Sequence, residues 1–264
     1  MSSKTFLSLS KAESMSAYRQ ILENSDDKWE TSKALAIKGK YGDAMFSAIV
    51  SIEELIKSLI VLFNGRGFEF GKVKGIKRFF KSHQIRHFMG YAMFVINVFS
   101  EEVVFFLQKL RANPEEGFAF VNAVIDNDEK AHLLVKDYGL RMFESLAKEF
   151  EWFSMLETFR QNGMYVDYQD QLKTPIAISE NQYAELYSRL EKVRNVGLGL
   201  VETLNSNEEL YVKHFESLRG QFIRDNYYEK IETALTQLGT FRDPFVAVRL
   251  AFSGSQIPPK INLQ

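Results

Sequence analysis

Apolar residues recur at helical spacing along most of the chain, whereas the alternation typical of strands is scarce. The clearest stretch covers residues 43–63, where an apolar stripe steps by alternating four and three positions. Asp43 lies in its first turn, where a carboxylate interacts favourably with the helix dipole, and Gly65 and Gly67 suit its end. The pattern predicts one long helix here. The stripe consists of Met45, Ile49, Ile52, Ile56, Leu59 and Phe63.

Similar spacing predicts further helices on both sides of this segment. Ser25-Asp26-Asp27 is a candidate interruption of the first helix, and Gly90 a candidate bend in the third. Ser179 and Gln182 have the spacing of a capping box. Together the segments predict an all-α fold, with residues 164–175 as an ordered loop. The predicted helices span residues 11–40, 43–63, 76–110, 114–125, 133–159 and 179–204, followed by two shorter ones.

The composition is that of a folded protein from a reducing compartment. Apolar residues make up 45% of the 264 positions, which is ample core material. The absence of Cys excludes disulfides, thiolate metal sites and a Cys nucleophile. The first ten residues do not resemble a signal peptide, and the apolar runs at 59–63 and 91–96 are shorter than the roughly 20 residues of a membrane helix. We expect a cytoplasmic protein without a membrane partner.

The net charge is only −1, but residues 65–87 are strongly basic. They hold seven Lys and Arg against the single acid Glu69, a local charge of +6, with four Phe interleaved. Such a patch suits phosphate contacts and base stacking. An alternative is a solvated basic loop whose Phe side chains anchor it in the core. The predicted RNA or phosphate-binding residues are Lys57, Lys72, Lys74, Lys77, Lys81, Arg86 and His87.

Within this patch, Arg78 precedes His83 by five positions. His83 is a candidate acid or base at a ribose 2′-hydroxyl or at the leaving oxygen, and Arg78 is a candidate for stabilising charge on phosphorus. Five residues of continuous helix turn through about 140°, so the two side chains share a face only if a helix starts between them. In a dimer, the second copy of the chain can also supply whichever of the two side chains one copy does not place at the site. The alternative is a surface or interface histidine.

Metal sites are not expected. His83 and His87 share a helical face, but no Glu follows the first His, and Arg86 between them repels cations. We therefore predict neither a metal nor a small-molecule cofactor. Glu53 and Lys57 form an i, i+4 pair at the edge of the apolar stripe, worth about 0.2–0.5 kcal/mol if exposed, and Glu54 points to the polar side. An ordinary helix-stabilising pair is the alternative to a functional one.

Three segments together resemble the AbiV family of abortive-infection proteins, a branch of the HEPN superfamily. The first is residues 34–57, which includes Glu53-Glu54 and Lys57, and the second is Lys81-Ser82-His83 with Arg86. The third runs from Arg160 to Tyr168 with Pro175 and Ser179, and it contains the family-loop residues Tyr165, Asp167 and Tyr168. Taken alone, residues 164–168 also fit a turn anchored by tyrosines.

The resemblance implies a HEPN-like helical bundle over residues 1–204, with residues 205–264 as a C-terminal helical extension. It implies a phage-defence protein, expected to be a homodimer that acts on RNA or on a phage protein. As an enzyme it would be a metal-independent endoribonuclease, with His83 as acid or base, Arg78 at the phosphate and Glu53 or Glu54 orienting. The alternative is a non-catalytic module that inhibits by complexing a phage or translation-related protein.

Overall fold

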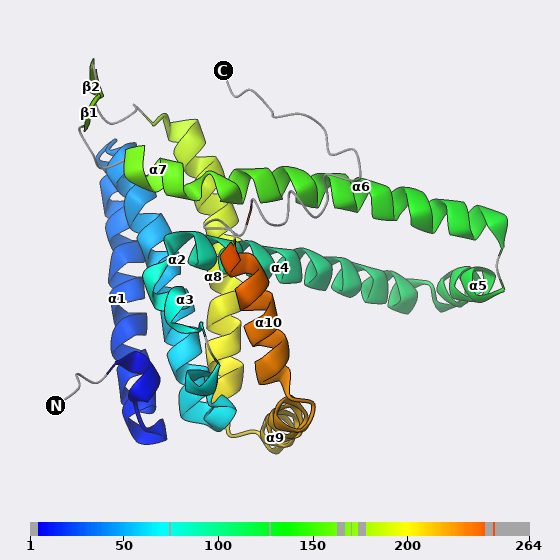
Figure 1. Ribbon diagram of the computed structural model, residues 1–264. Coiled ribbons are helices and arrows are strands. Elements are labelled where there is room, and N and C mark those ends of the chain that lie inside the picture. The colour runs from blue at the N-terminus through cyan, green and yellow to red at the C-terminus, as the bar shows by residue number, and fades with distance from the viewer. Residues whose placement is uncertain are drawn as a thin grey trace.

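The computed structural model describes residues 5–73, 75–126, 128–162, 167–169, 171–173, 178–240 and 245. They form a bundle of helices with a projecting arm (Figure 1), which confirms the predicted all-α fold. The helices are α1 (Lys11–Ile37), α2 (Tyr41–Phe63), α3 (Lys77–Lys81), α4 (His83–Ala112), α5 (Pro114–Ile125), α6 (Glu129–Ser154), α7 (Leu156–Asn162), α8 (Glu180–Asn205), α9 (Glu209–Arg224) and α10 (Tyr227–Thr240).

The predicted loop at 164–175 contains a short antiparallel hairpin instead. Its strands are β1 (Asp167–Gln169) and β2 (Gln171–Lys173), with Tyr168 opposite Leu172 in the register. Residues 163–166, 170 and 174–177 lie outside the described part of the chain. The helical period therefore stops here, as the sequence predicted, but paired strands were not foreseen.

Helices α1 and α2 form a close pair held partly by serines. α1 starts at a capping box formed by Ser10 and Glu13 and runs unbroken to Ile37, so the predicted interruption near Ser25 is wrong. The buried Ser25 hydroxyl donates to the carbonyl of Ser51 on α2 at 2.8 Å. Because that hydroxyl finds its partner on the neighbouring helix, it does not compete with the backbone hydrogen bonds of α1.

The main core surrounds α2, whose predicted stripe is buried from Met45 to Leu59. α1, α4, α7 and α8 pack against it (Figure 1). α8 begins at the predicted capping box of Ser179 and Gln182. At Gly197, α8 comes so close to α2 that a Cβ atom would lie 2.6 Å from Leu55 Cδ2. Any larger residue at position 197 would displace the buried Leu55 side chain, so glycine allows the close packing of the two helices.

The predicted helix over residues 76–110 is divided, but at Ser82 and not at Gly90. Ser82 has extended backbone angles (φ −101°, ψ 118°), and α4 starts at the next residue. Gly90 lies inside α4, where it packs near Ile52 and Phe153. The break at Ser82 therefore separates Arg78 on α3 from His83 on α4.

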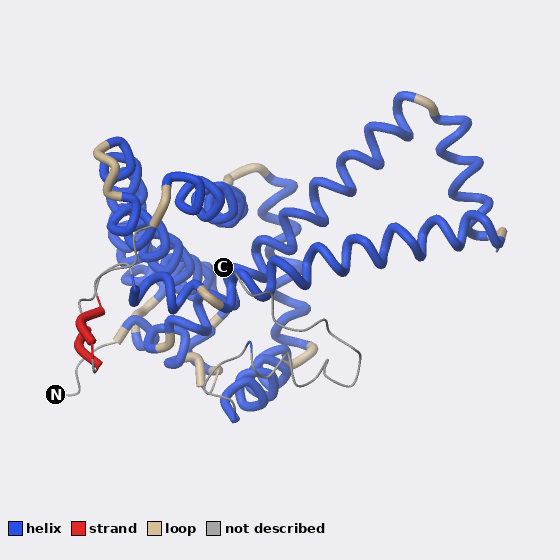
Figure 2. The backbone as a smooth tube through the Cα atoms, turned by 90° about the horizontal axis from the view of Figure 1, so that it is seen from above, coloured by secondary structure: helices blue, strands red, loops and turns tan. Residues whose placement is uncertain are grey.

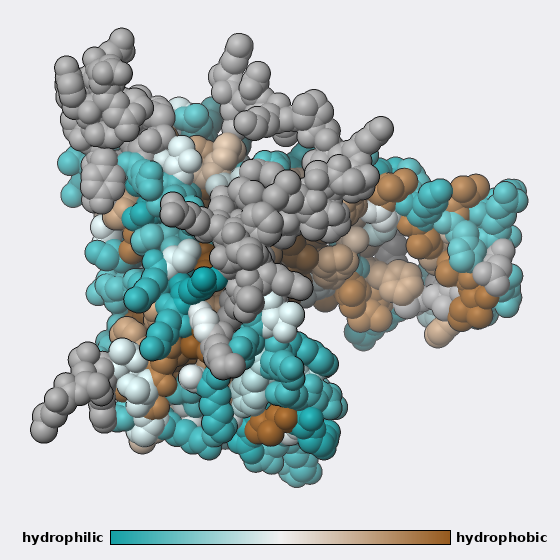
Figure 3. Space-filling model, in the orientation of Figure 1, coloured by the Kyte–Doolittle hydropathy of each residue, from teal (hydrophilic) through white to brown (hydrophobic). Residues whose placement is uncertain are grey.

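The distal half of α4, α5 and most of α6 form an arm, residues 96–148, that extends away from the bundle (Figures 1 and 2). Apolar side chains show on its surface (Figure 3). Among the described residues, His83–Gln108 is the one helical stretch long and apolar enough to cross a membrane, by length and composition alone. The short apolar runs in the sequence did not indicate this, because the stretch is interrupted by single polar residues.

Described residues beyond position 204 pack against the same bundle. Tyr228 and Ile231 of α10 contact the cluster of Val73, Ile76 and Phe79 under α3. The Tyr228 hydroxyl donates to the carbonyl of Phe68 at 2.9 Å. Further on, Phe245 is buried, with its ring centroid 5.0 Å from that of Phe150 and 5.6 Å from that of Phe88.

Candidate functional site

Glu53 is a buried carboxylate surrounded by basic side chains from the first two turns of α4. It is 2% exposed. His83 Nδ1 lies 2.7 Å from its Oε2, Arg86 Nη2 2.9 Å from Oε2, and His87 Nε2 2.9 Å from Oε1. Positions 83, 86 and 87 lie on one helical face, so a single carboxylate of α2 meets all three. Glu53 is therefore the centre of a polar site inside an apolar bundle.

The predicted pairing of Glu53 with Lys57 is wrong. Lys57 pairs with Glu54 instead, at 2.5 Å, and both side chains are largely covered at the edge of α2. The packing of α4 encloses Glu53 and leaves Glu54 nearer the surface. The i, i+4 spacing made Lys57 a possible partner of Glu53, but in the folded protein Glu53 contacts side chains of α4 instead.

The environment of Glu53 keeps it ionised. Burial alone would raise the pKa of its carboxyl group, but hydrogen bonds from His83 and His87, together with the charges of His87 and Arg86, lower that pKa well below its ordinary value of 4.5. A buried anion with this many donors is held in one place. The site therefore presents a fixed negative charge to the His83 ring.

His83 is the most accessible member of this network, with 37% of its side chain exposed. Three groups lie within 2.8 Å of its Nδ1: both Glu53 oxygens, which accept, and Arg86 Nη2, which donates. Because Arg86 Nη2 also donates to Glu53 and two acceptors face Nδ1 against one donor, we assign the proton to Nδ1. In the neutral ring Nε2 is then unprotonated and able to accept a proton. Glu53 thus orients His83 and sets its tautomer.

Arg86 and His87 do not have the predicted role at the surface. They are 2% and 4% exposed, and both contact Glu53, so neither is available to RNA phosphates in this structure. Arg86 also donates from Nη1 to the carbonyl of Phe79 in α3, at 2.9 Å. It therefore ties α3 to Glu53 and fixes the short helix that carries Arg78.

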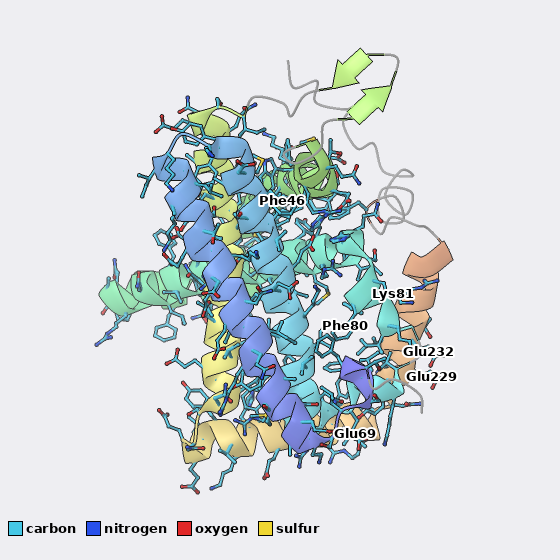
Figure 4. The ribbon with its side chains drawn as sticks, turned by 90° about the vertical axis from the view of Figure 1, so that its left-hand side faces the viewer. Phe46, Glu69, Phe80, Lys81, Glu229 and Glu232 are labelled. Carbon is cyan, nitrogen blue, oxygen red and sulfur yellow. The ribbon has the colours of Figure 1, made fainter. Side chains whose placement is uncertain are left out.

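A new helix starts between Arg78 and His83, which is the condition under which their side chains can face the same site. α3 ends at Lys81 and α4 starts at His83, so the continuous helical turn that would separate the two side chains is absent. Arg78 is exposed, as are Lys77 and Lys81 on the same helix. Figure 4 shows Lys81 at the end of α3 beside α10. Three exposed cationic side chains thus lie on the short helix that directly precedes the partly exposed imidazole of His83.

Lys72 and Lys74, the other predicted phosphate-binding residues, differ in their outcome. Lys72 is exposed but pairs with Glu69 at 2.5 Å, and Lys74 lies outside the described residues. The interleaved phenylalanines pack inward: Phe68 and Phe70 contact each other and Phe222, with ring centroids 5.6–6.4 Å apart. Phe68 and Phe70 thus anchor the basic segment to the bundle, as the alternative interpretation had it.

Glu157 on α7 is a neighbour that the sequence did not indicate. Its carboxylate, that of Glu53 and a ring nitrogen of His83 lie within 4.8 Å of one another, a possible set of metal ligands. Arg160 neutralises Glu157 at 2.8 Å, as Arg86 does Glu53 at 2.9 Å. Burial would raise the pKa of Glu157, but the hydrogen bond from Arg160 lowers it overall. With two guanidinium groups bound, the cluster fits a hydrogen-bond network better than a cation.

The family-loop residues lie at the edge of what the structure describes. Asp167 and Tyr168 belong to β1, and Tyr165 is outside the described residues. Their part in function stays a prediction.

Comparison with known proteins points to one family. A family model described as AbiV, of the HEPN type, matches residues 13–195, which is more than half of the chain. No curated protein and no solved structure gave a match. The matched region runs from α1 into α8 and contains Glu53, His83 and the α3–α4 break. The chain therefore belongs to the AbiV family of HEPN proteins, and its function is of the abortive-infection type.

Proposed function

We propose that this protein is a metal-independent endoribonuclease whose acid–base residue is His83. The observation that carries the proposal is the pairing of a half-exposed His83 with the buried, ionised Glu53, next to exposed cations on α3. A carboxylate that fixes the tautomer of an imidazole is a recurring way to prepare a general base.

The chemistry follows from the free nitrogen of His83. Its Nε2 accepts the proton of a ribose 2′-hydroxyl, while the 2′-oxygen attacks phosphorus and forms a 2′,3′-cyclic phosphate. The bond to the 5′-oxygen breaks, and that oxygen takes up a proton from water. Glu53 stabilises the imidazolium that forms, because its negative charge lies 2.7 Å from Nδ1. The same ring can act in the opposite direction as the acid.

The exposed cations of α3 provide the phosphate contacts in this proposal. Arg78 lies on α3, across the break from His83, and is assigned to the charge that develops on phosphorus. Lys77 and Lys81 are assigned to neighbouring phosphates. Arg86 and His87 hold Glu53 from within and do not contact RNA.

Cleavage of single-stranded RNA by the purified full chain in EDTA tests the proposal, with the product ends analysed for 2′,3′-cyclic phosphate. We expect His83→Ala to lower the cleavage rate by a factor of about 100 or more, within the range for a lost acid–base group. The matched control is His214→Ala, which removes an exposed histidine of α9. Arg78→Ala, compared with Arg224→Ala on the same helix as His214, tests the phosphate role in the same way.

Equal cleavage by wild type and His83→Ala would refute the acid–base role, provided that circular dichroism shows both folded. If no RNA is cleaved and none is bound, the protein-binding alternative takes its place. RNA affinity that falls steeply with salt supports the phosphate contacts of α3, because such contacts release counterions.

A further inference from the structure

Two basic side chains from different helices meet at a glycine where α2 ends, at the bottom of the bundle in Figure 1. The chain continues there as the π-helical segment Asn64–Phe68, which packs against α1 and α9. A Cβ atom on Gly67 would lie 3.2 Å from Lys11 Nζ and 3.5 Å from Arg219 Nη1. The two nitrogen atoms are therefore no more than about 7 Å apart, a distance at which like charges repel.

No acidic side chain of the described residues neutralises this pair. Lys11 is exposed and Arg219 is half-buried, and neither forms an ion pair or a side-chain hydrogen bond within the described part of the chain. By contrast, Lys213, on the same helix as Arg219, pairs with Glu209. Glu13, the acid nearest to Lys11 in the sequence, accepts instead from the backbone at the start of α1, at 2.8 Å. The repulsion between the two cations is thus left uncompensated.

Arg66 adds a third cation directly beside Gly67. Its Nη2 donates to Asn205 Oδ1 at the end of α8, at 2.9 Å, and this contact holds the guanidinium in place. Its Nε is buried and has no hydrogen-bond acceptor among the described residues. A buried donor without an acceptor costs free energy, and a bound ligand or water is the usual explanation for one. The same place therefore combines unpaired positive charge with an unused donor.

We propose that Lys11, Arg66 and Arg219, which we call the foot cluster, bind a phosphoryl group. Such a group carries negative charge and several acceptor oxygens around one phosphorus atom, which suits donors that come from three separate elements. Its charge would offset the repulsion between the cations. The phosphoryl group can belong to free phosphate or a nucleotide, or to an RNA strand, since the chemistry recognised is the same.

The foot cluster is separate from the site at His83. Arg66 follows Glu53 by 13 positions along α2 and its continuation, which is about 20 Å at the rise of a helix. The proposal therefore does not depend on ribonuclease activity, and a protein without that activity would still bind at the foot cluster.

Titration calorimetry of the full chain with inorganic phosphate, at constant ionic strength, tests the site. We expect saturable binding by wild type, weakened about tenfold or more in Lys11→Gln and in Arg219→Gln, because each removes a charge-assisted contact. The matched control, Lys213→Gln, removes a cation of α9 that is already paired and should bind like wild type. Arg78→Ala and His83→Ala should also keep this binding, which separates its failure from failure of the ribonuclease proposal.

Thermal unfolding gives a second reading that a purely structural role would not produce. Without phosphate, Lys11→Gln and Arg219→Gln should unfold at or above the wild-type temperature, because repulsion is relieved. Added phosphate should raise the unfolding temperature of wild type more than that of either variant, since a ligand stabilises the state that binds it. Variants less stable than wild type without phosphate would overturn the proposal.

Binding of a labelled single-stranded RNA distinguishes the two sources of the phosphoryl group. If both variants lose affinity for phosphate but bind RNA like wild type, the ligand is free phosphate or a nucleotide. If they lose affinity for RNA, the foot cluster contacts the RNA strand. Wild-type affinity of both variants for both ligands, or no binding of either ligand by wild type, would overturn the proposal.

Discussion

The first two turns of α4 bury charged side chains, whereas its distal half leaves apolar ones in contact with solvent. Arg86 is 2% exposed, but Phe106, five turns later on the same helix, is 41% exposed. Burying Arg86 is tolerated because Glu53 supplies the opposite charge within the chain. Nothing in the described part of the chain compensates the exposure of the distal half. The first region satisfies its charges within one copy of the protein, whereas the second leaves apolar side chains exposed to solvent.

The largest expected effect concerns the buried charge. Glu53→Gln leaves the Arg86 guanidinium buried without its counter-charge, so we expect it to lower the free energy of unfolding by about 3–5 kcal/mol. Chemical denaturation measures this. Glu54→Gln is the matched control, because its partner Lys57 lies nearer the surface, and it should cost about 1 kcal/mol or less. Equal losses for the two variants would mean that Arg86 is not held by charge.

Acid should weaken the same region. The pKa of Glu53 is lowered in the folded protein, so its ionised form stabilises the fold at pH values above its ordinary value of 4.5. As the pH falls below about 4.5 the unfolded chain takes up a proton there and the folded one does not, and this stabilisation is lost. The difference in unfolding free energy between wild type and Glu53→Gln should therefore shrink with falling pH in that range. A constant difference down to pH 3 would contradict the assignment.

The smallest effect is expected on the arm. Leu134→Gln should change the free energy of unfolding by no more than about 0.5 kcal/mol, because that side chain is 61% exposed. Denaturation at low protein concentration is the measurement. A loss above about 2 kcal/mol would show that the arm packs its apolar side chains within one copy, and the contrast between the two regions of α4 would disappear.

Sequence periodicity predicted the helices well where packing is regular. The stripe of α2 and the capping box at Ser179 were both confirmed, because each is a local pattern with a local physical cause. The helix break was misplaced at Gly90. Glycine lowers helix propensity anywhere, but Gly90 lies inside α4 with ordinary contacts to Ile52 and Phe153, while Ser82 takes the extended conformation.

The candidate site was half predicted. Glu53, Arg78 and His83 were named from the sequence, and the structure brings Glu53 and His83 within 2.7 Å of each other. The pairing of Arg86 with Glu53, and of Lys57 with Glu54, could not be predicted. The sequence shows which side chains are charged, but it does not show which of them become buried together. Glu157 gave no signal at all, since it lies more than 70 positions from His83 and is brought close by the packing of α7.

By itself the sequence determined the helical class, the course of α2, the basic segment at 65–87 and the family. These follow from local periodicity, composition and short motifs, which are properties of neighbouring residues. The tertiary structure alone decided that Glu53 is enclosed by His83, Arg86 and His87, that a helix starts between Arg78 and His83, and that the apolar side chains of distal α4 stay exposed. The reason is that burial and pairing depend on residues distant in the chain, and local patterns do not specify which of them meet.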